Sequence, residues 1–571
     1  MGVARSRAER ALALGITVVA LLPVAVTTVT RWGSKYLPLS DAAIIDARVR
    51  DVWSTDIPLV GAYSRYGWSH PGPVSFWLTA PLSLVTGRAA WATLVGFALL
   101  QGVAIGLIAW FAWRQFGALG VAFWLAIASF GSLAVRGESY LRPWNPHVAL
   151  PFFTLLVLLT WLITRGSARV LPLHVAVATF LVQTHVGYAP LVLATYVMLA
   201  GSIWMDRRWV GWALLVGGVL WLPPLLEVIV HWPGNVWAFV SNQVLHPHEA
   251  RIGTRDAIGV FASEFHPGSP LVHAAIRTNP FTGGVVPVGL GWSIVPIALL
   301  VTLSRLERTL ARVVTALVVG GLLALLSVTG GPFPYLFHWI HPLAALVLLA
   351  PISVYLARRV PRVLTAALVV PIVVASVVVA HDVASTGIDG VDPYTSATRE
   401  LLAQLRSSHQ PQGTVLLRFQ GSGLGGVRDG LMDELDREGA DVRVDDGQPF
   451  AYGHSRVAAE SEVSSVWYVA EDGLDLDDAA ARPGAVVIAE THPLSDAELQ
   501  EEQQLRGELR DQLTAAGRAD LVAKLGDPLL RVLAVDVPGV DATRVDRLTD
   551  LVDKERAHVC RCGIVAIPPN V

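Results

Sequence analysis

The chain has 571 residues, of which 53% are apolar and only 16% charged, and its formal net charge at pH 7 is −3. This composition excludes a single soluble domain and predicts an integral membrane protein. The near-neutral charge and the dispersed arginines argue against a nucleic-acid partner, because nucleic-acid binding needs a concentrated basic patch.

Apolar stretches long enough for transmembrane helices recur through the first 381 residues, since a bilayer core requires roughly 20 helical residues per crossing. We predict about eleven transmembrane helices, near residues 11–31, 89–111, 118–135, 147–164, 170–184, 187–204, 209–231, 284–304, 311–329, 337–357 and 363–381. The first stretch is interpreted as a retained helix, because it is long and no small-residue cleavage site follows it.

The short connections between these stretches alternate in charge. One set is rich in arginine: Arg114, Arg165, Arg169, Arg207, Arg208, Arg305, Arg308, Arg358, Arg359 and Arg362. Cationic loops resist translocation, so this set is expected in the cytoplasm together with the basic amino terminus. An odd number of crossings then places the last 190 residues outside the plasma membrane. The preference for arginine over lysine suggests a bacterial source.

The first outer loop, residues 32–88, contains two predicted juxtamembrane helices. Residues 41–53 follow a Pro-Leu-Ser helix start, and their apolar residues group on one side, which is typical of a helix lying along the membrane surface. Residues 71–87 form a second amphipathic stretch, interrupted by prolines and too short to cross comfortably. A polar-aromatic loop with Tyr63, Tyr66, Trp68 and His70 lies between them.

The composition changes after residue 382, so we divide the chain into a transmembrane domain, residues 1–381, and an extracytoplasmic α/β domain, residues 382–571. Strand-length apolar runs alternate there with helical patterns. The runs lie at 414–419, 466–470, 485–489 and 530–534, and the helices near 395–407, 424–438, 495–517 and 541–556.

A glycine-rich turn, Gly421-Ser-Gly-Leu-Gly-Gly426, follows the first of these strands and precedes Asp445 and Asp446 at about the distance of a dinucleotide-binding fingerprint. An extracytoplasmic location lacks the usual nucleotide supply. We therefore interpret the motif as a tight strand-to-helix turn, with anion or glycan binding left open.

Three features of the first 230 residues resemble the GT-C glycosyltransferases that use polyprenyl-phosphate sugars, especially the aminoarabinose transferase and protein O-mannosyltransferase group. An acid, Asp41, opens the first outer loop. That loop ends in a proline-rich turn before an aromatic helix, Ser69-His-Pro-Gly-Pro-Val-Ser-Phe-Trp-Leu78. The second outer loop ends in Trp144-Asn-Pro-His147. The chain departs from the family pattern at Ala42, where a second acid is common, and at His70, where a lysine is common.

The resemblance implies a polytopic GT-C-like fold and a sugar transfer from a polyprenyl-phosphate donor to an envelope glycan or lipid. Asp41 matches the family's general base. The leaving phosphate needs cations or fixed donors, and Arg142, Arg136, His70 and His147 are on the predicted outer side to supply them, with Arg142 the first choice.

Further candidates for substrate binding lie near the outer ends of predicted helices. They are Asn145, His185 and Glu227, together with Tyr63, Tyr66 and Trp68 of the first loop. Buried polar groups in a membrane are functional candidates, but His185 and Glu227 could equally serve interhelical packing, and the aromatic residues could anchor the interface. No cofactor is indicated with certainty. A divalent metal at His246-Pro-His248-Glu249 stays open, although the spacing matches no tight ligand pattern.

Two other functions remain compatible with the sequence. A transporter or flippase for a lipid-linked or polar substrate would use the same buried polar groups, and internal symmetry would support it. A catalytically inactive GT-C-like scaffold would fit the missing second acid.

Overall fold

The computed structural model of this protein describes residues 6–203, 206–247, 249–268, 288–330, 332–421, 425–445, 449–492, 494–522, 525, 530, 534, 537–557 and 561–568. The chain divides into two compact units. The first comprises residues 1–36, 44–388 and 449–454, and the second comprises residues 37–43, 389–448 and 455–571.

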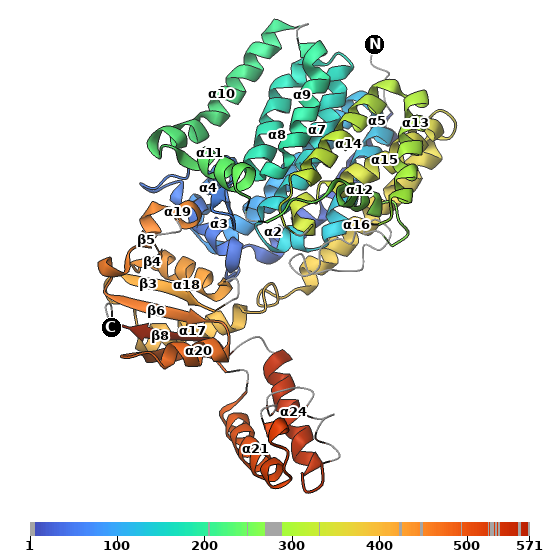
Figure 1. The fold of residues 1–571 in the computed structure, drawn as a ribbon. Helices are drawn as coiled ribbons and strands as arrows, with labels where there is room; N and C mark the ends of the chain where they lie inside the picture. Colours follow the sequence, from blue (N-terminus) through green and yellow to red (C-terminus); the bar gives the residue numbers. More distant parts are fainter. Residues whose placement is uncertain are drawn as a thin grey trace. The chain divides into compact units, whose positions relative to one another are not determined.

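The first unit is a helical bundle (Figure 1). Its helices are α1 (Arg7–Ala20), α2 (Leu22–Arg31), α4 (Val74–Val85), α5 (Ala90–Val135), α6 (Glu138–Leu141), α7 (Asn145–Thr164), α8 (Leu171–Thr184), α9 (Ala189–Ile203), α10 (Arg207–Val230), α11 (Gly234–Phe239), α12 (Thr254–Ser263), α13 (Ile294–Leu306), α14 (Arg308–Leu326), α15 (Ile340–Ala357) and α16 (Pro361–Ser385). A short hairpin, β1 (Tyr63–Ser64) and β2 (Trp68–Ser69), lies in the first loop. Helix α3 (Ser40–Asp51) begins in the second unit and ends in the first.

Each predicted transmembrane segment overlaps a described helix, although residues 204 and 284–287 lie outside the described part of the chain. Six of the described helices are long and apolar enough to cross a bilayer, or seven if the bent pair α1 and α2 forms one span, and other apolar helices are shorter. Helix α5 is broken at Gly117 (φ 72°) and covers two predicted segments. Apolar side chains are exposed along α10 and α16, as on helices that face lipid. The bundle is therefore that of a multi-pass membrane protein.

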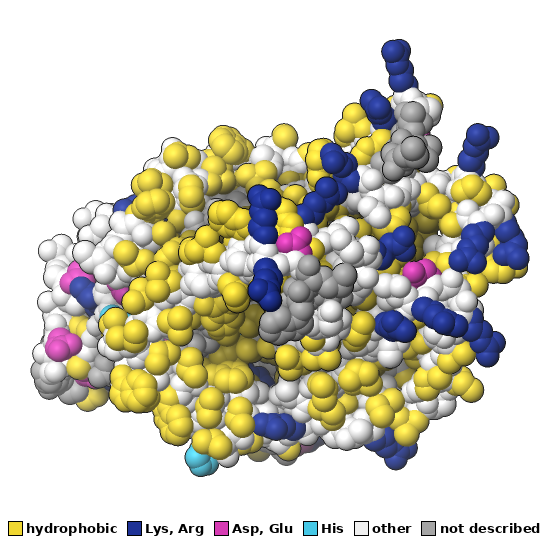
Figure 2. Space-filling model, turned by 90° about the horizontal axis from the view of Figure 1, so that it is seen from above, with side chains coloured by type: hydrophobic (Ala, Val, Ile, Leu, Met, Phe, Trp, Pro, Cys, Tyr) yellow, Lys and Arg dark blue, Asp and Glu magenta, His cyan; other side chains and the backbone are white. Residues whose placement is uncertain are grey.

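The arginine-bearing turns gather at one end of the bundle. The amide of Ala118, at the break in α5, donates to Glu9 of α1; Arg165 pairs with Glu307 at 3.6 Å. Arg358 donates to the carbonyl oxygen of Leu306. Figure 2 shows Lys and Arg side chains collected over one face of the molecule, with few acidic ones among them. The arginine-bearing turns thus lie together at one end of the bundle, as the predicted alternation of charge requires.

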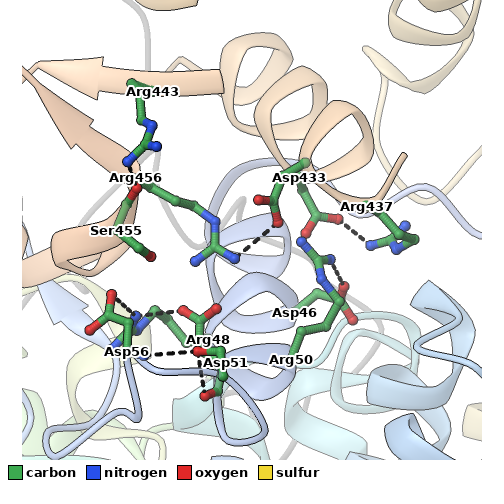
Figure 3. A network of polar contacts seen from close by, with 12 residues as sticks. Asp46, Arg48, Arg50, Asp51, Asp56, Asp433, Arg437, Arg443, Ser455 and Arg456 are labelled. Carbon is green, nitrogen blue, oxygen red and sulfur yellow. Dashed lines mark hydrogen bonds and ion pairs between the residues drawn. The ribbon is translucent and has the colours of Figure 1, made fainter. Parts of the chain in front are cut away.

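Helix α3 differs from the amphipathic surface helix that the sequence predicts, because residues 42–50 are all buried. Its charged side chains pair within the first unit: Arg50 with Asp46 at 2.7 Å, and Arg48 with Asp51 at 2.5 Å and Asp56 at 3.3 Å (Figure 3). Sequence periodicity missed this, since a helix whose charges are neutralised in pairs can be buried on every side.

The second unit contains a six-stranded sheet in the order β5-β4-β3-β6-β8-β7. The strands are β3 (Val415–Gln420), β4 (Val442–Asp445), β5 (Val457–Ala458), β6 (Ser465–Ala470), β7 (Val486–Glu490) and β8 (Gly563–Ile567), and β8 runs antiparallel to both neighbours. The helices that accompany them are α17 (Thr395–Ser408), α18 (Gly426–Arg437), α19 (Pro449–Tyr452), α20 (Gly473–Ala480), α21 (Asp496–Ala515), α22 (Ala519–Val522) and α24 (Ala542–Ala557). Three predicted strands coincide with β3, β6 and β7. The fourth prediction, a strand at 530–534, is wrong at its described ends, because Leu530 and Ala534 are helical; residues 531–533 lie outside the described part of the chain.

The glycine-rich turn leads from β3 into α18, as predicted, although residues 422–424 lie outside the described part of the chain. The amide of Val427, in the first turn of α18, donates to Oε1 of Glu471 at 2.7 Å. A carboxylate of the protein itself thus takes the position where a helix amino terminus would hold a phosphate.

Candidate functional site: a buried histidine cluster

Five histidines meet in the first unit, at the end of the bundle opposite the arginine-bearing turns. Their ring centroids lie 4.8 Å apart for His70 and His185, 5.3 Å for His147 and His338, and 5.8 Å for His338 and His341. His185 is also close enough to His338 for an electrostatic effect, so the two groups are continuous. The first loop, α7, α8 and the start of α15 each contribute to this histidine cluster.

All five side chains are buried, yet several ring nitrogens have no hydrogen-bond partner among the described residues. Both nitrogens of His338 are in this state, as is Nδ1 of His147 and of His185. A buried polar group without a partner costs about 1–3 kcal/mol, so natural proteins rarely retain several in one place without a use for them. The cluster is therefore the strongest candidate for a ligand site in the described structure.

The first loop holds His70 through its backbone. The amide of Gly61 donates to the carbonyl oxygen of His70, and the amide of His70 donates to that of Ala62, both at 2.8 Å. The amide of Val186 donates to Nδ1 of the ring at 3.2 Å. Burial, followed by the neighbouring His185, lowers the pKa of His70 well below its usual value. The neutral ring therefore carries its hydrogen on Nε2.

Two glycines allow this loop to lie directly on the end of α8. A Cβ at Gly72 would overlap the side chain of Gln183, and a Cβ at Gly61 would lie 2.9 Å from the Gln183 carbonyl oxygen. Only glycine permits such an approach. Nε2 of Gln183 in turn donates to the carbonyl oxygen of Leu220, which ties α8 to α10.

The start of α7 supplies a second set of predicted residues. Nδ2 of Asn145 donates to the carbonyl oxygen of Thr184 at 3.1 Å, next to His185. The rings of Trp144 and His147 are 4.9 Å apart in an edge arrangement. Arg142 lies close enough to His147 for an electrostatic effect and 3.4 Å from Glu138. The structure therefore brings Arg142, Asn145 and three of the predicted histidines to the same end.

Three residues of the site were missed from the sequence: His338, His341 and Glu264. Nδ1 of His341 lies 3.1 Å from Oε2 of Glu264, and both side chains are buried. The sequence signal was the spacing His338-Trp-Ile-His341 at the mouth of a predicted transmembrane segment, where two histidines three apart share a helical face. Glu264 follows α12 and carries no comparable signal.

Arg136, a predicted phosphate ligand, forms a bidentate ion pair with Asp382 at 2.7 and 2.9 Å. Because Asp382 lies in α16, this pair joins the end of α5 to the end of α16. In the structure, Arg136 therefore links two helices.

Glu227 supports the site indirectly. Its carboxylate accepts from the amide of Asn235 at 3.0 Å in the first turn of α11, and the Asn235 side chain exchanges hydrogen bonds with the backbone of Ser69, beside His70. These hydrogen bonds, from Glu227 through Asn235 to Ser69, hold β2 of the first loop in place.

The predicted aromatic residues occupy different surroundings. Trp68 is buried, with its ring 5.4 Å from that of His70 and its Nε1 without a partner among the described residues. The hydroxyl of Tyr66 contacts Glu249 and Thr329, and the ring of Tyr63 lies 6.5 Å from Phe450. Trp68 is the one of these three that joins the histidine cluster.

No three His, Cys, Asp or Glu side chains of the described residues lie in a metal-binding arrangement. Within the predicted metal motif, His248 lies outside the described residues. Asp41, the predicted base, stands in the first turn of α3, in the segment that groups with the second unit.

A separate small cavity of about 20 Å³ lies inside the helical bundle, with Tyr140 and three serines among its otherwise apolar lining. None of the five histidines lines it. The histidine cluster is therefore a distinct feature of the bundle.

The chain matches no protein-family model and no curated protein sequence. Its fold is similar to the crystal structure of ArnT from Cupriavidus metallidurans in the apo state, with a TM-score of 0.51, 13% sequence identity and coverage of 84% of this chain and 95% of that chain. ArnT bound to undecaprenyl phosphate aligns with a TM-score of 0.49, 14% identity and coverage of 84% and 95%. The arabinofuranosyltransferase AftD from Mycobacteria aligns with a TM-score of 0.33 and 16% identity, covering 86% of this chain and 38% of AftD. The first of these likenesses shows the fold, and it confirms the GT-C fold expected from the sequence.

Proposed function

We propose that this chain is a membrane glycosyltransferase that moves a sugar from a polyprenyl-phosphate donor to an envelope glycan or lipid acceptor. The reaction takes place at the extracytoplasmic face, with the amino terminus in the cytoplasm. This orientation is supported by the arginine-bearing turns at the opposite end of the bundle.

The histidine cluster is the observation that carries the proposal. A departing lipid phosphate is an anion that needs hydrogen-bond donors and positive charge in a partly dry site. Buried imidazoles with unpartnered nitrogens, next to the guanidinium of Arg142, offer both. The ArnT fold adds support, because the resemblance to GT-C transferases independently implies such a donor.

In the proposed mechanism, Asp41 accepts the proton of the acceptor hydroxyl while that oxygen attacks the anomeric carbon. The bond between this carbon and the phosphate oxygen breaks, and its electron pair leaves with the lipid phosphate. Arg142, His147 and the neighbouring imidazoles stabilise the charge that develops there. A single displacement inverts the anomeric configuration.

The remaining candidates have supporting roles in this proposal. Trp68 offers an aromatic face beside His70 for the sugar, and Asn145 and His185 offer polar groups at the same end. Tyr63 and Tyr66 shape the approach of the acceptor. Glu227 positions the first loop through Asn235, and Arg136 stabilises the helix ends through Asp382.

The test is incubation of the purified protein in lipid nanodiscs with a panel of polyprenyl-phosphate sugars and envelope extracts, followed by mass spectrometry of the products. Transfer of a hexose, pentose or aminosugar with release of free polyprenyl phosphate is expected. Transmembrane movement of the donor without a new glycosidic bond would contradict the assignment and identify a transporter instead.

A further inference from the structure

The segment that leads into α3 is held by a helix of the carboxyl-terminal part of the chain. Residues 37–43 belong to the second compact unit, together with α18. Leu39 is 4% exposed, and a Cβ at Gly430 of α18 would overlap its Cδ2 atom and lie 3.2 Å from the carbonyl oxygen of Pro38. A Cβ at Gly426 would lie 2.6 Å from Oγ of Ser40.

Gly426 and Gly430 are four residues apart and so lie on one face of α18. We call this surface the two-glycine face. Glycine in a helix costs about 1 kcal/mol relative to alanine, so two of them weaken α18 unless the close approach of another segment offsets the cost. Leu39 and Ser40 are the side chains that fill the space.

The amino end of α18 is itself fixed to the sheet. Gly425 has a left-handed conformation (φ 71°), and Glu471, which follows β6, accepts from the amide of Val427 at 2.7 Å. Glu471 is buried, and burial raises the pKa of its carboxyl. Helix α18, which carries the two-glycine face, is thus held in place at its amino end.

The segment that contacts α18, residues 37–43, has a constrained backbone at Ser40, the residue before Asp41. Ser40 has a φ of +50°, in the left-handed region, which costs a non-glycine residue about 1–2 kcal/mol. Such a conformation persists only where the surroundings enforce it. The contacts of Leu39 and Ser40 with α18 are surroundings of that kind, and they set the direction in which α3 begins.

We propose that Gly426 and Gly430 are positioning residues for Asp41, so that the carboxyl-terminal unit takes part in catalysis by holding the start of α3. This rests on the proposed function, in which Asp41 is the base. A carboxylate must lie within hydrogen-bond reach of the proton it removes, and a displacement of about 1 Å can cost on the order of a hundredfold in rate.

The test compares the sugar-transfer kinetics of Gly430→Ala, Leu39→Ala and the double variant. The matched control is Gly507→Ala, which adds the same methyl group to α21, where nothing lies within 4 Å. Gly430→Ala is expected to lower kcat by about tenfold or more with little change in the KM for the donor. The thermal midpoint of unfolding should change little, because the methyl group meets the far end of the flexible Leu39 side chain while alanine favours the helix. The double variant should recover most of the lost kcat, because the shortened side chain leaves room for the methyl group.

Leu39→Ala alone keeps the proposal testable if Gly430→Ala does not fold, since it loosens the same contact and should also lower kcat with the KM maintained. Wild-type kcat in Gly430→Ala, or a double variant no more active than Gly430→Ala, would overturn the positioning role. Asp41→Asn separates the two proposals. An inactive Asp41→Asn beside a fully active Gly430→Ala refutes only the positioning role, whereas an active Asp41→Asn refutes the base and the positioning role together.

Discussion

Nδ1 of His341 lies 3.1 Å from Oε2 of Glu264, although 77 residues separate them in the chain. The contact places a buried carboxylate at one end of the histidine cluster, where it can balance a positive charge on an imidazole. Glu264→Gln keeps the size and an acceptor but removes the charge. We expect it to lower kcat by about tenfold while the protein remains folded, as measured by product formation and by thermal unfolding.

Glu249→Gln is the control for Glu264→Gln, because Glu249 is an exposed carboxylate that pairs with Arg65 at 3.5 Å. It should leave kcat unchanged. Equal kcat values for wild type and Glu264→Gln would show that the charge of Glu264 plays no part in sugar transfer.

His338→Leu should separate stability from activity. Neither ring nitrogen of His338 has a partner among the described residues, so replacing the imidazole by an apolar side chain of similar size is expected to keep or raise stability by up to about 1–3 kcal/mol. Sugar transfer should fall by at least about a hundredfold, because a donor to the leaving phosphate is lost. Kinetics and thermal unfolding on the same preparation measure both effects.

The companion variant is His174→Leu, another buried histidine, whose Nε2 lies 3.0 Å from Oγ1 of Thr160, away from the cluster. It should cost about 1 kcal/mol of stability and leave transfer intact. If His338→Leu retained sugar transfer as His174→Leu is expected to do, the unpartnered nitrogens of His338 would have no role in catalysis.

His70 predicts how stability depends on pH. Burial and His185 hold its pKa well below the usual value, so the unfolded state binds a proton that the folded state does not. Stability contributed by the neutral ring is present above about pH 6.5 and is lost as the pH falls below it, by up to about 1.4 kcal/mol per pH unit. The midpoint of thermal unfolding should therefore drop between about pH 7.5 and 5.5, and drop less in His70→Gln. An equal drop in both proteins would show that His70 is not the group responsible.

The bidentate pair of Arg136 and Asp382 predicts a structural coupling. Each single variant, Arg136→Gln and Asp382→Asn, should cost about 1–3 kcal/mol of stability by leaving its partly buried partner uncompensated. The double variant should cost less than the sum and retain transfer. A double variant that is stable but inactive would instead return Arg136 to the role of a phosphate ligand.

The apolar segments and the residues near their ends could be predicted from sequence, because a membrane imposes length and sidedness on every helix. His70, His147 and His185 were found in this way. Glu264 and His338 were not, since their significance arises only when α12 and the start of α15 come together in three dimensions. The burial of α3 was also missed. The ion pair of Arg50 and Asp46 lowers the free-energy cost of burying both charges, and the hydrophobic pattern of the sequence does not reveal that pair.

The most direct test of the proposed mechanism is to measure, side by side, donor affinity and turnover for Asp41→Asn and His338→Leu. The labelled probe is a polyprenyl-phosphate sugar that the wild-type protein turns over, added to protein in nanodiscs. We predict that Asp41→Asn binds the donor as the wild type does but forms no product, whereas His338→Leu loses donor affinity as well as turnover. Normal turnover by Asp41→Asn, or undiminished donor binding and turnover by His338→Leu, would contradict it.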